Sequence, residues 1–93
     1  MKVTPDIIRE EFIGTNAQIA NSPHQGYIGI NGEVIGETRN TFTLNQAGQT
    51  KRIVKDQAVF QFKFSDGTVV EIDGKLLVGK PEDRLKKQAK RLW

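Results

Sequence analysis

Apolar and polar residues alternate through the middle of the chain, and this period of two predicts short β-strands. The clearest case is Ala58–Phe64, in which Phe60, Phe62 and Phe64 share one side of the predicted strand. Glycines are frequent in the first predicted strand, which suits a bent and twisted strand. Tight turns are predicted where Asp-Gly pairs occur. The other predicted strands cover 27–37, the stretch around Phe42 and Leu44, 51–55, 68–72 and 75–78.

Short strands of this kind, joined by tight turns and carrying one apolar face, predict a mainly β fold. We expect a small twisted antiparallel barrel of five or six strands. The 93 residues are enough for one modest core, so 1–93 is predicted to be a single domain with the barrel over 17–79.

A short helix is predicted at each end of the barrel. In the N-terminal one, over 4–13, Thr4 is the expected N-cap and Pro5 the first helical residue. The C-terminal one, over 81–92, begins with Pro81 and has acids in its first turn and bases later. Its apolar stripe consists of Leu85, Ala89, Leu92 and Trp93. Both helices are too short to be stable unless they dock on something.

The composition excludes several classes of protein. With no cysteine, the chain forms no disulfide, no cysteine-based zinc site and no thiol nucleophile. No apolar run approaches the roughly 18–20 residues that span a membrane, and no signal-peptide pattern opens the chain. A cytoplasmic protein with no membrane partner is the expectation.

The net charge of +3 is unevenly distributed. Residues 1–79 contain eight basic and nine acidic residues, whereas 80–93 contain six basic and two acidic residues. The excess of positive charge therefore lies in the C-terminal segment. Such asymmetry indicates a polyanionic partner, of which nucleic acid is the commonest.

The residues that usually carry catalysis or bind metal form no recognisable set. His24 is the single histidine and lies in a loop without a second ligand nearby in the sequence. The acids are scattered through strands and turns with no spacing that indicates a catalytic pair. We therefore predict no catalytic residue, no metal site and no cofactor bound by this chain.

The basic residues are better candidates for a functional site. Arg39 lies in the turn Thr38–Thr41, where its side chain is placed to meet a phosphate. We expect it to converge at one rim of the barrel with the cations of the strand 51–55. The predicted C-terminal helix adds a second basic face. A solvated strand edge and a solubilising helix face remain alternative interpretations. The candidate nucleic-acid-binding residues are Arg39, Lys51, Arg52, Lys55, Arg84, Lys87 and Arg91.

Three stretches of the sequence together resemble one family. They are "GINGEVIGETRNTFTL" (Gly29–Leu44), "KRIVKDQAVFQF" (Lys51–Phe62) and "DGTVVEIDGKLLVGKPEDRLKK" (Asp66–Lys87). The family is archaeal ribonuclease P protein component 1, the counterpart of the eukaryotic twenty-nine-kilodalton subunit. The opening "IIREEFIGTNAQI" also matches, so the resemblance covers nearly the whole chain. The stretch around His24 departs from the family pattern, and no role is carried to it.

The resemblance implies an Sm-like (SH3-type) barrel and an accessory role in a ribonucleoprotein whose RNA removes the 5′ leader from precursor tRNA. Magnesium is implied for that RNA and not for this chain. The implied partners are the ribonuclease P RNA, a zinc-ribbon subunit and other ribonuclease P proteins, with precursor tRNA met indirectly. The implied interface with the zinc-ribbon subunit comprises Ile7, Ile8 and Phe12.

Two other functions are considered. An Sm-like RNA-binding protein that forms a homomeric ring would sediment as a hexamer or heptamer, whereas an isolated accessory subunit is expected to be a monomer. An SH3-type protein-interaction module reads proline-rich peptides through an aromatic groove. Apart from the phenylalanines, only Tyr27 and Trp93 are available for such a groove.

Overall fold

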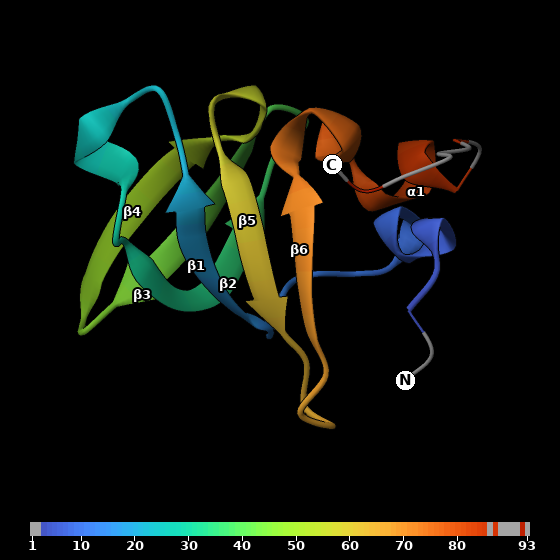
Figure 1. Cartoon of the computed structure of the whole chain (residues 1–93), viewed down its shortest axis with the longest axis horizontal. Coiled ribbons are helices and arrows are strands. Elements are labelled where there is room, and N and C mark those ends of the chain that lie inside the picture. Colours follow the sequence, from blue (N-terminus) through green and yellow to red (C-terminus); the bar gives the residue numbers. More distant parts are fainter. Residues whose placement is uncertain (1–2, 86, 88–91, 93) are drawn as a thin grey trace.

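Six antiparallel strands form one twisted sheet, in the order β4-β3-β2-β1-β5-β6 (Figure 1). The structure is a computed structural model that describes residues 3–85, 87 and 92. The predicted mainly β, antiparallel fold is confirmed. The strands are β1 (Asn16–Asn21), β2 (Asn31–Glu37), β3 (Thr41–Gln46), β4 (Gln49–Val54), β5 (Val59–Lys63) and β6 (Val69–Asp73).

The strand ladder is open between its two outer members, because β4 and β6 do not pair with each other in the described part of the chain. Two 3-10 helices meet across this opening: η3 (Lys55–Gln57) follows β4, and η4 (Gly74–Leu77) follows β6. The Gly74 amide donates to the Ala58 carbonyl at 2.9 Å. A β-carbon on Gly74 would lie 1.8 Å from the Lys55 carbonyl oxygen, so glycine is required for this close approach.

The phenylalanines predicted from the alternation form the centre of the core. Phe60 and Phe62 are fully buried and Phe64 is 9% exposed, which confirms the predicted strand register. Phe12 joins them from the N-terminal segment, with its ring centroid 4.4 Å from that of Phe62. Aromatic pairs at such distances contribute beyond the area that they bury.

Several predicted elements differ from those observed. The N-terminal helix is a 3-10 helix, η1 (Pro5–Arg9), and not a helix over 4–13. Strand β1 was not predicted, because only Ala17 and Ile19 mark its buried face. The predicted strand 27–37 begins later, after the 3-10 helix η2 (Gln25–Tyr27). The predicted strand 75–78 is largely the 3-10 helix η4.

The C-terminal helix is described only over α1 (Pro81–Arg84), beside η1 in Figure 1. The rest of the prediction over 81–92 falls mostly outside the described residues, which omit 86, 88–91 and 93. Of the predicted apolar stripe, Leu85 is 61% exposed and Leu92 is buried, so these two do not share one docked face. The Leu92 carbonyl accepts a hydrogen bond from the Asp73 amide at 2.6 Å.

Candidate nucleic-acid interface

A buried cluster of three charged side chains lies where β2, η3 and α1 meet. Lys55 and Arg84 are fully buried, and the side chain of Glu37 is 1% exposed. The Lys55 Nζ donates to Glu37 Oε2 at 2.7 Å. Arg84 donates to the same carboxylate with both terminal nitrogens, from Nη1 to Oε2 and from Nη2 to Oε1. Two cations therefore share one anion inside the protein. We call Glu37, Lys55 and Arg84 the buried ion cluster.

Lys55 and Arg84 each point inward and lie against an aromatic ring of the core. Lys55 has the same parity as Ile53, whose side chain points into the core, and its ammonium lies 4.7 Å from the centroid of the Phe42 ring. Arg84 is the last residue of α1, and its guanidinium carbon lies 5.5 Å from the centroid of the Phe12 ring. Both aromatic faces are favourable positions for a cation.

Backbone carbonyls use the remaining donors of the two cations. The Lys55 ammonium also donates to the carbonyls of Thr38 (2.8 Å), Arg39 (3.2 Å) and Gly79 (2.8 Å). Arg84 donates to carbonyls of two segments of the chain. Within the described residues, no buried side-chain nitrogen or oxygen lacks a hydrogen-bond partner. The carbonyl acceptors of Arg84 belong to Ile8, Glu10, Leu77 and Gly79.

Burial lowers the pKa of the Lys55 ammonium, while its hydrogen bond to Glu37 opposes this change. The nearby positive charges of Arg84 and Lys87 lower this pKa further. The Glu37 carboxylate therefore stabilises the charged form of Lys55, and backbone carbonyls accept its remaining hydrogen bonds.

The predicted RNA contacts of Lys55 and Arg84 are wrong. Both side chains are fully buried and their donors are bound to Glu37 and to backbone carbonyls, so neither is available to a phosphate. Cations lie at the surface in most proteins, and the expectation for Lys55 and Arg84 followed from this tendency. Lys55 continues the inward parity of Ile53 from the end of β4, which was a signal against that expectation.

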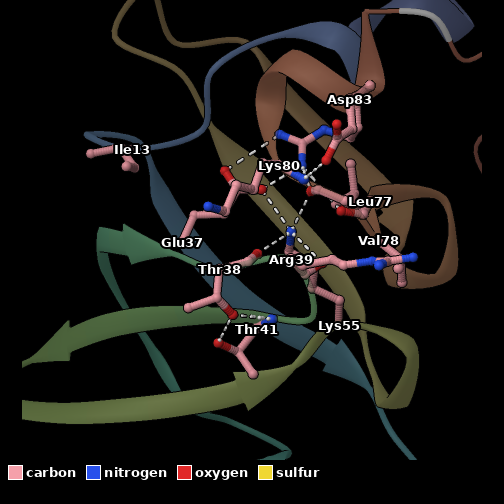
Figure 2. Close-up of polar contacts among 12 residues, drawn as sticks. Ile13, Glu37, Thr38, Arg39, Thr41, Lys55, Leu77, Val78, Lys80 and Asp83 are labelled. Atoms are coloured by element: carbon pink, nitrogen blue, oxygen red, sulfur yellow. Dashed lines mark hydrogen bonds and ion pairs between the residues drawn. The ribbon is translucent and has the colours of Figure 1, made fainter.

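Arg39 is exposed and contacts the buried ion cluster through its backbone. Its carbonyl accepts from the Gly79 amide at 2.7 Å as well as from Lys55. Figure 2 shows the Arg39 side chain extending away from Lys55 toward Val78. There it borders a hollow together with four residues of the segment that leads into and past α1. We call the residues that line this hollow the Arg39 corner: Arg39, Val78, Gly79, Asp83 and Lys87.

Lys87 is half-buried at this corner, and its Nζ donates to the Val78 carbonyl. Its backbone amide donates to the Arg84 carbonyl at 3.0 Å. Two of the predicted RNA-binding residues, Arg39 and Lys87, are therefore brought together although they are far apart in the sequence. Asp83 is also present, and its carboxylate accepts from the Lys80 amide at 3.3 Å.

The remaining basic candidates do not converge with Arg39 on one rim. In β4, Lys51 pairs with Leu44 and Arg52 with Thr43, so their side chains point to opposite faces of the sheet. Arg52 is exposed and Lys51 is half-buried. Arg91 lies outside the described residues. The expectation of a single basic rim is corrected to a smaller pair, Arg39 and Lys87.

The predicted interface of Ile7, Ile8 and Phe12 also needs correction. These side chains are 5%, 1% and 0% exposed, because they pack into the core of this chain. They are not available to a partner subunit. The exposed apolar residues of the same segment are Val3 and Ile13, at 42% and 47% exposure.

Sequence reasoning missed Glu37 altogether. It ends a strand and resembles any solvated acid, and its two partners come from distant segments, so no local pattern marks it. The described residues contain no group of three His, Asp or Glu side chains placed to bind a metal. In the same residues no helix is long and apolar enough to cross a membrane.

Residues 5–87 match the model of the family described as ribonuclease P/MRP, subunit p29. The chain is 45% identical to ribonuclease P protein component 1 of Methanosphaera stadtmanae over 87 residues, which covers 92% of this chain and 94% of that protein. It is 41% identical to the protein of the same name from Methanococcus vannielii, covering 100% and 98%. Among solved structures it is similar to Mth11, a homologue of the human RNase P protein Rpp29. That match has a TM-score of 0.61 and 43% identity and covers 81% of this chain and 97% of the other.

Proposed function

From the premise that this chain belongs to the ribonuclease P/MRP subunit p29 family and is a ribonuclease P protein subunit, we propose that it binds the RNA of that ribonucleoprotein. In this role it supports RNA folding and substrate recognition during removal of the 5′ leader from precursor tRNA. The proposed contact surface is the Arg39 corner, with Arg52 as a separate exposed contact.

The observation that carries this proposal is that Arg39 combines a bound backbone with an exposed side chain. Its backbone is bound on the inner side by Lys55 and Gly79, while its side chain is exposed. A guanidinium pairs with phosphate in a planar, bidentate arrangement. Lys87 adds a second positive charge at the same hollow. The acid Asp83 lowers the positive potential there, so this corner suits one backbone phosphate better than an extended run of them.

We further propose that the chain is an accessory subunit without catalytic residues of its own. The chemistry belongs to the RNA and its magnesium ions, and this chain binds no cofactor. Its proposed partners are the ribonuclease P RNA, the zinc-ribbon subunit and other ribonuclease P proteins in the cytoplasm. With Ile7, Ile8 and Phe12 in the core, we propose the exposed Val3 and Ile13 as the apolar residues of the N-terminal segment that contact the zinc-ribbon subunit.

The test is the salt dependence of affinity for ribonuclease P RNA. Loss of one phosphate contact lowers the slope of log affinity against log salt by up to about 1. We expect this change for Arg39→Gln and for Lys87→Gln, with a smaller one for Arg52→Gln. Lys63→Gln is the matched control, because Lys63 is an exposed cation at the far end of β5.

A wild-type slope for Arg39→Gln, with RNA binding otherwise intact, would remove the Arg39 corner from the interface. Sedimentation of the isolated chain tests the rival ring-forming function, for which a hexamer or heptamer would be observed instead of the expected monomer.

A further inference from the structure

The turn that carries Arg39 is bound from two sides. On the inner side of the turn, the Lys55 ammonium restrains the backbone, because it donates to the carbonyls of both Thr38 and Arg39. On its outer side the Thr38 and Thr41 hydroxyls are 2.6 Å apart, and the Thr41 amide donates to Thr38 Oγ1 at 3.1 Å (Figure 2). The backbone of this turn is therefore fixed while the Arg39 side chain remains free to reach outward.

The same cations also fix the opposite wall of the hollow. Lys55 and Arg84 both donate to the Gly79 carbonyl, at 2.8 and 2.6 Å. The Gly79 amide in turn donates to the Arg39 carbonyl at 2.7 Å. A small set of hydrogen bonds thus joins the turn to the segment that bears Lys87. Each of these hydrogen bonds is made by Gly79 or by a residue of the buried ion cluster.

A buried ion cluster is poor evidence for stability as such. Removing charges from water is unfavourable, and apolar residues of similar volume often stabilise a fold equally well or better. The donors of such a cluster instead restrict the position of the backbone, because each hydrogen bond to a carbonyl requires a defined distance and angle. Here the bonds converge on the backbone of the residues that line the Arg39 corner.

We propose that Lys55 is a positioning residue for RNA binding. With Glu37 and Arg84, it holds the Arg39 turn against Gly79, so that Arg39 and Lys87 meet one RNA phosphate without prior ordering of the backbone. Fixing a binding loop in its bound conformation raises affinity by reducing the entropy lost on association. This inference rests on the proposed function, since it assigns Lys55 a part in the binding made by Arg39.

A double-mutant cycle tests the proposal, with affinity for ribonuclease P RNA and thermal unfolding measured for each protein. The variants are Lys55→Met, Arg39→Gln and the two combined. Lys55→Met leaves Glu37 paired with Arg84, so the remaining cluster is electrically balanced. Lys75→Met is the matched control, because it removes one exposed lysine away from the Arg39 corner.

We expect Arg39→Gln to weaken RNA binding by about tenfold, the usual effect of losing a hydrogen bond to a charged group. Lys55→Met should weaken it several-fold in the wild-type background and less than about twofold when Arg39 is already replaced. Its effect on the melting temperature should be the same in both backgrounds, since stability does not act through the Arg39 side chain.

The two possible failures are distinct. If Arg39→Gln binds RNA as wild type does, the proposed function of the Arg39 corner fails. If Arg39→Gln binds weakly but Lys55→Met has the same effect in both backgrounds, or resembles Lys75→Met, the positioning role alone is overturned.

A second variant decides the matter even if Lys55→Met does not fold. Thr38→Val removes the exposed hydroxyl that bonds Thr41 and leaves the buried ion cluster intact. We expect a several-fold loss of affinity that disappears in the Arg39→Gln background, with an unchanged melting temperature. Wild-type affinity for Thr38→Val, beside weak binding by Arg39→Gln, would show that the geometry of the turn is immaterial and would overturn the proposal.

Discussion

At the scale of single residues, Glu37 is the most consequential side chain of the chain that the structure describes. It is the carboxylate shared by Lys55 and Arg84, both of which are fully buried. The carbonyl groups around the two cations are neutral, and their dipoles compensate the two positive charges only in part. The cluster therefore depends on one acid for its balance.

Glu37→Gln should destabilise the fold strongly, because it leaves two buried cations without a counter-charge. Breaking a buried pair in this way costs about 3–5 kcal/mol, a large part of the roughly 5–15 kcal/mol that stabilises a small domain. Urea unfolding followed by circular dichroism measures the change. Glu33→Gln is the control, since Glu33 is an exposed acid in the same strand. Equal midpoints for the two variants would contradict the role of Glu37.

Lys55→Met should be less destabilising than Glu37→Gln, although Lys55 makes more hydrogen bonds than most side chains. After this change Glu37 still pairs with Arg84, and Gly79 and Arg39 keep other donors for their carbonyls. The main loss is the partner of the Thr38 carbonyl, worth about 1–3 kcal/mol for a buried polar group left unpaired. The order of the two midpoints in urea checks this, and the reverse order would refute it.

At the scale of elements, the predictions that succeeded rest on local repetition. Phe60, Phe62 and Phe64 alternate with polar residues, and a period of two specifies a half-buried strand whatever lies around it. Strand β1 escaped prediction because its apolar signal consists of Ala17 and Ile19 alone. Residues 75–78 alternate weakly and were assigned to a strand, yet contact with η3 turns the chain into η4 at Gly74. Tertiary contacts of this kind leave no mark in a short window of sequence.

The contact between η3 and η4 should tolerate no side chain at Gly74. A β-carbon there would overlap the Lys55 carbonyl oxygen and lie 2.7 Å from that of Ala58, so the two 3-10 helices would have to separate. We expect Gly74→Ala to destabilise the fold by about 3 kcal/mol, at the upper end for an overpacked core. Gly36→Ala is the control, because its added carbon would meet only Thr43 at an ordinary 3.6 Å. Thermal unfolding compares them, and similar melting temperatures would contradict the close approach.

At the scale of the whole molecule, the site could not be predicted because it joins segments from the two ends and the middle of the chain. Arg84 binds carbonyls of Ile8 and Glu10 on one side and the Glu37 carboxylate on the other. In sequence it looked like one member of a basic helical face with Lys87 and Arg91. Burial depends on partners far along the chain, so the local spacing of basic residues assigned Arg84 and Lys55 to the surface.

Arg84→Lys should loosen the N-terminal segment more than the barrel. A lysine keeps the charge for Glu37 but lacks the planar fork that also reaches the Ile8 and Glu10 carbonyls. Hydrogen exchange should therefore accelerate at the Ile7 and Glu10 amides, which bond within and at the end of η1, and change little at the Val34 amide. Uniform acceleration at all three would indicate general destabilisation and no specific link between the chain termini.

The isolated chain should leave precursor tRNA intact. Hydrolysis of a phosphodiester requires a metal ion or a positioned acid and base, and the described residues hold no cluster of three His, Asp or Glu side chains. The most buried acid, Glu37, is occupied by two cations and cannot serve as a base. Purified protein incubated with precursor tRNA and magnesium should give no cleavage. The same tRNA should be cleaved when ribonuclease P RNA and the other subunits are added. That cleavage should be slower when Arg39→Gln replaces the wild type. Cleavage by the protein alone that is abolished by changing one of its acids would refute the accessory role, because a contaminating nuclease would be unaffected by that change.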